Sequence, residues 1–149
     1  MAAYLSNELA GTTDGKTSAP VAANLRQRGV VTNARLKRYR STITFNAQVA
    51  GDVIQLATLP PGCVFAFGTL VNSVSTATAT IAIGTAAAPG KYRPAAVSTA
   101  VDTVALFSTA ANASADVFTA DELLYATVGT AALPASGTMV VDFYISVMS

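Results

Sequence analysis

Positively charged side chains that could bind an anionic partner gather in one short stretch of this 149-residue chain. Arginine and lysine bind carboxylates and phosphates, and arginine can do so through two parallel hydrogen bonds. The stretch could therefore contact an acidic protein surface or the backbone of a nucleic acid. An acidic protein surface is favoured, because arms that package nucleic acid are usually longer and more basic. The six expected partner-binding residues are Arg26, Arg28, Arg35, Lys37, Arg38 and Arg40.

Side chains that could perform catalysis are few. The chain has no histidine, which removes the commonest general base and a frequent metal ligand. Asp121 and Glu122 are adjacent carboxylates, but residues 119–122 have the form of a helix-capping box. Cys63 is the single cysteine, so it cannot form an internal disulfide, and we expect it to fill a small apolar position in a strand. We therefore expect no enzyme, and no catalytic, cofactor-binding or metal-binding residues.

Charge divides the chain into two parts of opposite sign. Residues 1–40 hold seven Lys or Arg and two acidic residues, a net charge of +5, whereas residues 41–149 hold two basic and six acidic residues, a net charge of −4. Residues 6–24 have few large apolar groups and cannot bury enough surface to fold alone. We predict an extended basic N-terminal arm over residues 1–40, with helical character only at 34–39, and one folded domain over residues 41–149.

Alternation of apolar and polar residues predicts that the domain is built from β-strands. In residues 138–147 the alternation places Asp142, Tyr144 and Ser146 outward. The residues that it places inward are Met139, Val141, Phe143, Ile145 and Val147. Short strands separated by Gly and Pro turns, with no long amphipathic helix, predict an all-β antiparallel β-sandwich, jelly-roll-like, with an extended N-terminal arm. The expected strands are 41–49, 53–57, 63–75, 76–83, 101–108, 123–129 and 138–147, with a loop at 86–93 and a helical turn starting at 119–122.

Residues 53–90 carry no charged side chain, which raises the question of a membrane span. Pro60, Pro61 and Gly68 interrupt this stretch, so it lacks the roughly 20 continuous apolar residues that a span requires. The N-terminus includes Glu8 and has no basic start followed by an apolar block, so no secretory signal is expected. We therefore expect no membrane association.

Four strand-and-turn segments of the domain carry a resemblance to a known family. They are residues 45–56 (FNAQVAGDVIQL), 59–62 (LPPG), 79–85 (ATIAIGT) and 129–138 (GTAALPASGT). Together they resemble the small head-decoration or cement proteins of tailed bacteriophages. The resemblance implies a jelly-roll-like sandwich, made in the host cytoplasm, that binds the capsid exterior of the virion as a homodimer or homotrimer. It also implies that such a protein bridges and stabilises subunits of the major capsid protein.

Three other functions fit the same sequence. A tail or fibre component would share the composition and the fold. A small coat protein whose basic arm binds packaged nucleic acid would bind in a salt-sensitive way through residues 35–40. A carbohydrate-binding module would expose aromatic side chains on one sheet face; Tyr125 and Tyr144 are candidates, but the chain has no Trp.

Overall fold

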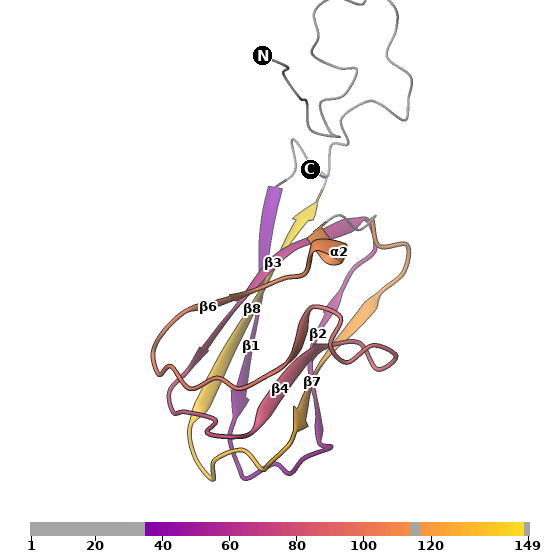
Figure 1. Ribbon diagram of the computed structural model, residues 1–149. Coiled ribbons are helices and arrows are strands. Elements are labelled where there is room, and N and C mark those ends of the chain that lie inside the picture. Colours follow the sequence, from indigo (N-terminus) through magenta and orange to yellow (C-terminus); the bar gives the residue numbers. More distant parts are fainter. Residues whose placement is uncertain (1–34, 114–116, 148–149) are drawn as a thin grey trace, which may run out of the picture.

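The computed structural model of the chain describes residues 35–113 and 117–147. These residues form an all-β fold with one single-turn helix, and Figure 1 shows the strands as two packed layers. Among them, no helix has the length and apolarity that a membrane crossing needs. The elements, in chain order, are β1 (Arg35–Thr44), β2 (Val53–Leu59), β3 (Cys63–Asn72), β4 (Thr80–Gly84), β5 (Arg93–Ala96), β6 (Ala105–Phe107), α2 (Ala110–Ala113), β7 (Glu122–Gly129) and β8 (Thr138–Val147).

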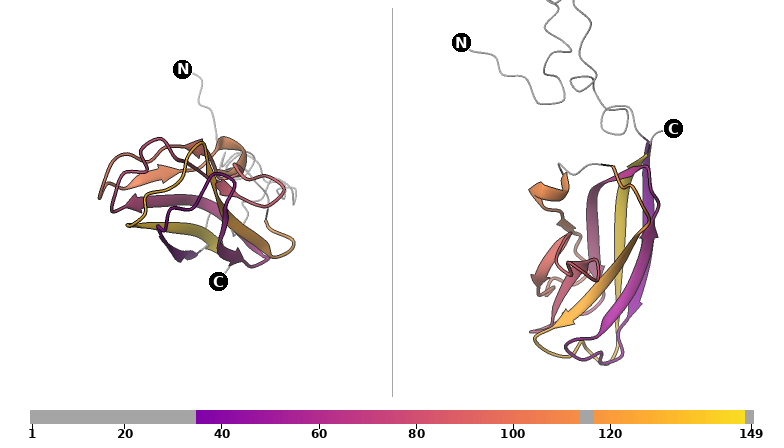
Figure 2. Two further views of the ribbon diagram at one scale, coloured as in Figure 1. Left: turned by 90° about the horizontal axis from the view of Figure 1, so that it is seen from below. Right: turned by 90° about the vertical axis from the view of Figure 1, so that its right-hand side faces the viewer.

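The strands pair in the nested order of a jelly roll. Sheet A has the order β1-β8-β3-β6, and sheet B has the order β2-β7-β4-β5. The first strand therefore pairs with the last, the second with the seventh, the third with the sixth and the fourth with the fifth, all antiparallel. Figure 2 shows the two sheets packed face to face. This arrangement confirms the predicted all-β antiparallel sandwich.

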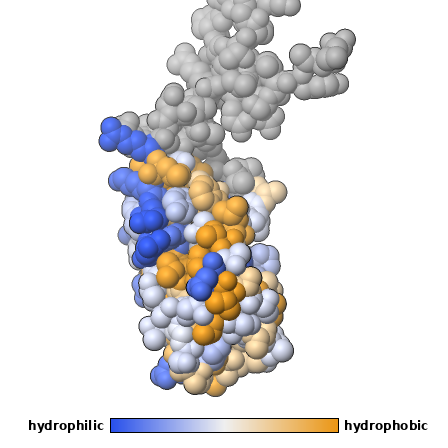
Figure 3. Space-filling model, turned by 90° about the vertical axis from the view of Figure 1, so that its left-hand side faces the viewer, coloured by the Kyte–Doolittle hydropathy of each residue, from blue (hydrophilic) through white to orange (hydrophobic). Residues whose placement is uncertain are grey.

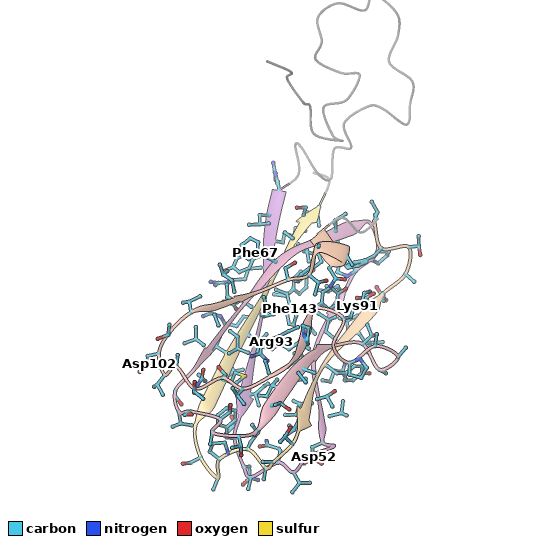
Figure 4. All side chains as sticks on the ribbon, viewed as in Figure 1. Asp52, Phe67, Lys91, Arg93, Asp102 and Phe143 are labelled. Atoms are coloured by element: carbon cyan, nitrogen blue, oxygen red, sulfur yellow. The ribbon has the colours of Figure 1, made fainter. Side chains whose placement is uncertain are left out.

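The interior lies between the two sheets and is built by alternation along each strand. On β8 the side chains of Met139, Val141, Phe143 and Ile145 are fully buried, as their spacing predicts. Figure 4 shows Phe143 between the two sheets. Burying each of these side chains stabilises the fold by about 1.5–3 kcal/mol, so β8 is a principal source of the hydrophobic stabilisation of sheet A.

Aromatic rings fill the part of the core that lies beneath β6 and the loop before β5. The ring centroids of Phe65 and Tyr92 are 4.4 Å apart, and those of Phe107 and Phe143 are 5.9 Å apart with an edge-to-face orientation. The ring of Phe107 lies against the backbone of Gly68, where an added Cβ would come within 2.1 Å of a ring carbon. Gly68 therefore provides the space that lets β6 pack closely onto β3.

Strand β1 begins at Arg35, whereas the charge pattern predicts an arm through residue 40. Residues 35–40 are strand and have no helical character, because they pair in unbroken register with β8. Tyr39 packs against the core, and the Ser41 hydroxyl donates a hydrogen bond to the Leu56 carbonyl on β2. Part of the predicted arm thus belongs to the sandwich. The rest of it, residues 1–34 with Arg26 and Arg28, lies outside the described residues.

Other local predictions were wrong in ways that the structure explains. The strand predicted over 41–49 begins earlier, at Arg35, and ends at Thr44, because Ala47 has a positive φ of 52° and turns the chain. No helical turn starts at 119–122, since Glu122 is the first residue of β7. The predicted strand over 101–108 shortens to β6, and helix α2 follows it. Strand β5 begins at Arg93, at the end of the predicted loop over 86–93.

Candidate partner-binding surface

Four of the six predicted partner-binding residues lie on β1, the edge strand of sheet A. Alternation along the strand separates them into two pairs. Arg38 and Arg40 project from the outer face of sheet A, opposite Tyr144 and Asp142 of β8. Arg35 and Lys37 share a side of the strand with Tyr39 and lie beyond the end of the core, where both are exposed. The structure thus brings the four cations to one sheet edge, but not to one face.

Arg40 binds an acidic residue of its own chain. Its Nε and Nη2 atoms donate to Oδ1 and Oδ2 of Asp142, each over 2.8 Å. The Arg40 side chain is 53% exposed, whereas that of Asp142 is only 7% exposed. The hydrogen bond from Arg40 lowers the pKa of Asp142, and the positive charges of Arg40 and Arg38 add to this effect, while burial opposes it.

This ion pair changes the expected roles of both residues. Asp142 does lie on the outer face of sheet A, as its position in β8 predicts, but the guanidinium of Arg40 covers it. In the sequence Arg40 and Asp142 are 102 positions apart, so no local pattern could have indicated the pair. Within residues 35–113 and 117–147, no ion pair joins Arg35, Lys37 or Arg38 to an acidic residue. These three cations remain the candidates for contact with a partner.

Apolar side chains lie next to the cations on the outer face of sheet A. The rings of Phe67 on β3 and Tyr144 on β8 stack with centroids 4.6 Å apart and planes 16° apart. Leu36 at one edge is 54% exposed, and Leu106 at the other edge is 73% exposed. Figure 3 shows this side of the molecule, with a hydrophilic band along one edge and hydrophobic patches beside it. We call this surface, defined by Leu36, Arg38, Phe67, Leu106 and Tyr144, the A face.

A second polar cluster attaches the loop before β5 to strand β7. The Tyr92 hydroxyl and the Lys91 ammonium both donate to Glu122, the latter over 2.5 Å. The ammonium also lies 5.1 Å from the ring centre of Tyr92 and 5.7 Å from that of Phe118. Burial of Tyr92, together with its hydrogen bond to Glu122, raises the pKa of its hydroxyl. Both carboxylate oxygens of Glu122 thus hold the loop before β5 against β7.

Two further side chains with reactive or charged groups, Cys63 and Arg93, make contacts within the sandwich. Cys63 is fully buried at the start of β3, which confirms the predicted strand position, and burial raises the pKa of its thiol. The guanidinium of Arg93 donates to the backbone carbonyls of Ile81, Ala96 and Val97. Among the residues that the structure describes, no group of three His, Cys, Asp or Glu side chains could hold a metal ion.

Comparison with known proteins places the fold among chains of phage capsids. No protein-family model matches the chain, and neither does any curated protein sequence. A chain of the Cyanophage Pam1 capsid asymmetric unit superposes with a TM-score of 0.64 and 19% identity, covering 87% of this chain and 94% of that one. A chain of the Ralstonia phage GP4 capsid gives a TM-score of 0.61 with 15% identity, covering 77% and 86%.

A third capsid contains the same fold. A chain from the acid-stable capsid of Helicobacter pylori bacteriophage KHP30 gives a TM-score of 0.57 with 15% identity. The match covers 76% of this chain and 89% of that one. At these identities the similarity establishes a shared jelly-roll fold, and the alignments span nearly the whole length of each neighbour.

Proposed function

We propose that this chain is a structural protein of a phage virion, and specifically a decoration or cement protein that binds the outside of the head. The observation that carries the proposal is the jelly roll itself, whose solved counterparts are chains of three phage capsids. The resemblance of residues 45–56, 59–62, 79–85 and 129–138 to head-decoration proteins supports the finer assignment. The proposed partners are the major capsid protein and further copies of this chain, as a homodimer or homotrimer.

The physical basis of this function is contact area. Only 11% of the residues are charged, so much of the surface can pack against neighbours with little loss of hydration. The A face presents an arginine and two aromatic side chains, residue types that are enriched at protein interfaces. Exposed leucines beside them add apolar area that a partner can bury. Many copies bound to one lattice gain avidity from repetition, so that each separate contact can be weak. Bound copies would hold neighbouring capsid subunits together.

The test is co-sedimentation of the purified protein with emptied capsids that were assembled without this chain. Saturable binding at a fixed number of copies per capsid is the expected result. A parallel sample with nucleic acid alone separates the cement function from the alternative of a nucleic-acid-binding coat protein. That alternative is favoured by one observation, the exposure of Arg35, Lys37 and Arg38 without an ion-pair partner in the described ranges.

A truncated protein tests the proposed contribution of the N-terminal arm. The truncation belongs after residue 34, because removal of residues 1–40 would also delete six residues of β1 that pair with β8. Weaker capsid binding with an unchanged melting temperature would support the arm as a contact. Binding to nucleic acid, with none to capsids, would overturn the cement function. Immunogold labelling of intact virions then separates a head location from a tail or fibre location.

A further inference from the structure

The A face differs from the outer face of sheet B in the side chains that it presents. On sheet B the outward residues of β2 and β7 include Val53, Gln55, Leu123, Tyr125 and Thr127, none of which is charged. On sheet A, two adjacent rows cross the strands from the basic edge to the apolar edge. One row holds Arg38, Tyr144 and Phe67, and the next holds Arg40, Asp142, Thr69 and Leu106.

On the outer side of sheet A, two positively charged side chains lie beside one carboxylate, so one positive charge is left without a balancing negative charge among the described residues. Asp142 holds Arg40 through two hydrogen bonds and neutralises one positive charge. Arg38 is exposed beside this pair and has no carboxylate of its own in the described part of the chain. A partner that covered Arg38 without supplying a negative group would have to remove its hydration at a cost. A partner on this face therefore needs an acidic group at the β1 edge.

The apolar residues indicate the other half of the partner surface. Leu36 and Leu106 project into solvent, and the stacked pair of Phe67 and Tyr144 lies between them on the middle strands. Binding hot spots are rich in aromatic and arginine side chains, and the contacts around them exclude water. A nucleic acid would use the cations but would leave both leucines without a contact. Each ring of the stack also has one side covered by the other ring, which limits base stacking.

From this arrangement we propose that the A face is the docking surface of the chain, and that its occupant is a protein surface with an apolar centre and carboxylates at one rim. The proposal rests on the cement function above and names the face and the chemistry through which the chain holds its partner. The carboxylate rim lies over Arg38 at the β1 edge, and the apolar centre covers the rings and Leu106. The outer face of sheet B then points away from this contact.

Two variants of the A face and two matched controls on sheet B test the proposal. Leu106→Asp and Arg38→Glu change exposed side chains at opposite edges of the A face. Leu123→Asp and Gln55→Glu make similar charge changes on the outer face of sheet B, where both residues are exposed. Binding of each variant to capsids assembled without this chain is measured by co-sedimentation over a range of concentrations. Thermal unfolding of each variant checks that the fold is retained.

We expect each A-face variant to weaken binding by about tenfold or more, and each control to stay within about twofold of the wild type. If the wild type binds capsids and all four variants bind equally well, the A face is not the docking surface, although the cement function stands. If the sheet B controls weaken capsid binding as much as the A-face variants do, the assignment of the docking surface to the A face is likewise wrong. If the wild type binds no capsid, both proposals fail, and binding to nucleic acid in the parallel sample would identify the other class of partner.

Discussion

Arg40 and Asp142 face each other across β1 and β8, and two hydrogen bonds of 2.8 Å join the guanidinium to the carboxylate. The pair connects β1, at the edge of sheet A, to β8, the strand that it pairs with among the described residues. It also assigns Arg40 to the internal structure of the sandwich, which leaves Arg35, Lys37 and Arg38 as the basic residues of β1 that can meet a partner.

Replacement of Asp142 by Asn should lower stability at neutral pH and have little effect in acid. Because the folded-state pKa of Asp142 is depressed, its ionised form stabilises the fold above the unfolded value of about 3.9. This stabilisation is lost as the pH falls through the lower folded-state value. Melting temperatures of wild type and Asp142→Asn should therefore converge on acidification below about pH 4. Asp121→Asn, at an exposed position, is the control; a difference that stays constant with pH would contradict the prediction.

Replacement of Gly68 by Ala should destabilise the protein by about 1–3 kcal/mol, the usual cost of overpacking. The added Cβ would lie 2.1 to 2.7 Å from three carbons of the Phe107 ring, which the core holds in place. Urea unfolding gives the change in free energy. Gly90→Ala is the control, because its nearest atom would be 3.4 Å away. Phe107→Leu should cost less in the Gly68→Ala background than in the wild type; additive effects would show that the contact is not the cause.

Replacement of Tyr92 by Phe should cost about 1.5–3 kcal/mol at neutral pH, because it removes a buried hydrogen bond to the carboxylate of Glu122. The pKa of Tyr92 is raised in the fold, so its contribution is complete below about pH 10 and decreases as the pH rises above that value. Unfolding measured at increasing alkaline pH should show a shallower loss of stability in Tyr92→Phe than in the wild type. Tyr125→Phe, on the outer face of sheet B, should keep the wild-type profile; a similar change in both variants would refute the assignment to Tyr92.

Replacement of Thr130 by Asn should stabilise the protein by up to about 1 kcal/mol. Thr130 has a φ of +67°, and the Ala131 amide donates to the Gly129 carbonyl across it over 2.8 Å, which defines a γ-turn with a positive φ. A β-branched residue is strained at a positive φ, and Asn, which is not branched at Cβ, is strained less. Thermal unfolding provides the measurement. Thr80→Ser keeps residue 130 and its backbone unchanged, and Thr80→Ala removes the 3.3 Å contact between the two threonine hydroxyls; both serve as controls. A lower melting temperature for Thr130→Asn than for the wild type would contradict the assignment of strain to Thr130.

Strands with a complete alternation could be predicted from the sequence. The limits of β8, residues 138–147, match the prediction, because five apolar residues occupy every second position and the face that they form is buried. Strand β5 could not be predicted in the same way. Its four residues are an arginine, a proline and two alanines, so no apolar alternation marks it, and the strand lies at the edge of sheet B.

The candidate site was only partly predictable, because its geometry depends on distant pairing. The basic cluster was evident from composition, yet clustered charge at residues 35–40 concealed the first part of a strand. Before the buried Ile43, only Tyr39 and Ser41 mark the inward side of this strand. The stack of Phe67 on Tyr144 needs the register between β3 and β8, which a bulge between Phe65 and Phe67 shifts by one residue. Likewise, Glu122 resembled a helix cap in sequence, but its partners Lys91 and Tyr92 come from a loop about 30 positions earlier.

The nested pairing of strands also limits the order in which the molecule can be built. Strand β1 is made first among the described strands, but its partner β8 comes last, so sheet A cannot close until translation of residues 138–147 is finished. Pairings this far apart in sequence make folding slow, because a long loop must close before any contact stabilises it. Strands β1 and β3 have exposed edges during this interval, and a chain cut short before β8 would lose the strand that lies between them. The sandwich therefore cannot exist until the β8 segment has been translated, and a chain that stops before β8 cannot complete the hydrophobic core of sheet A.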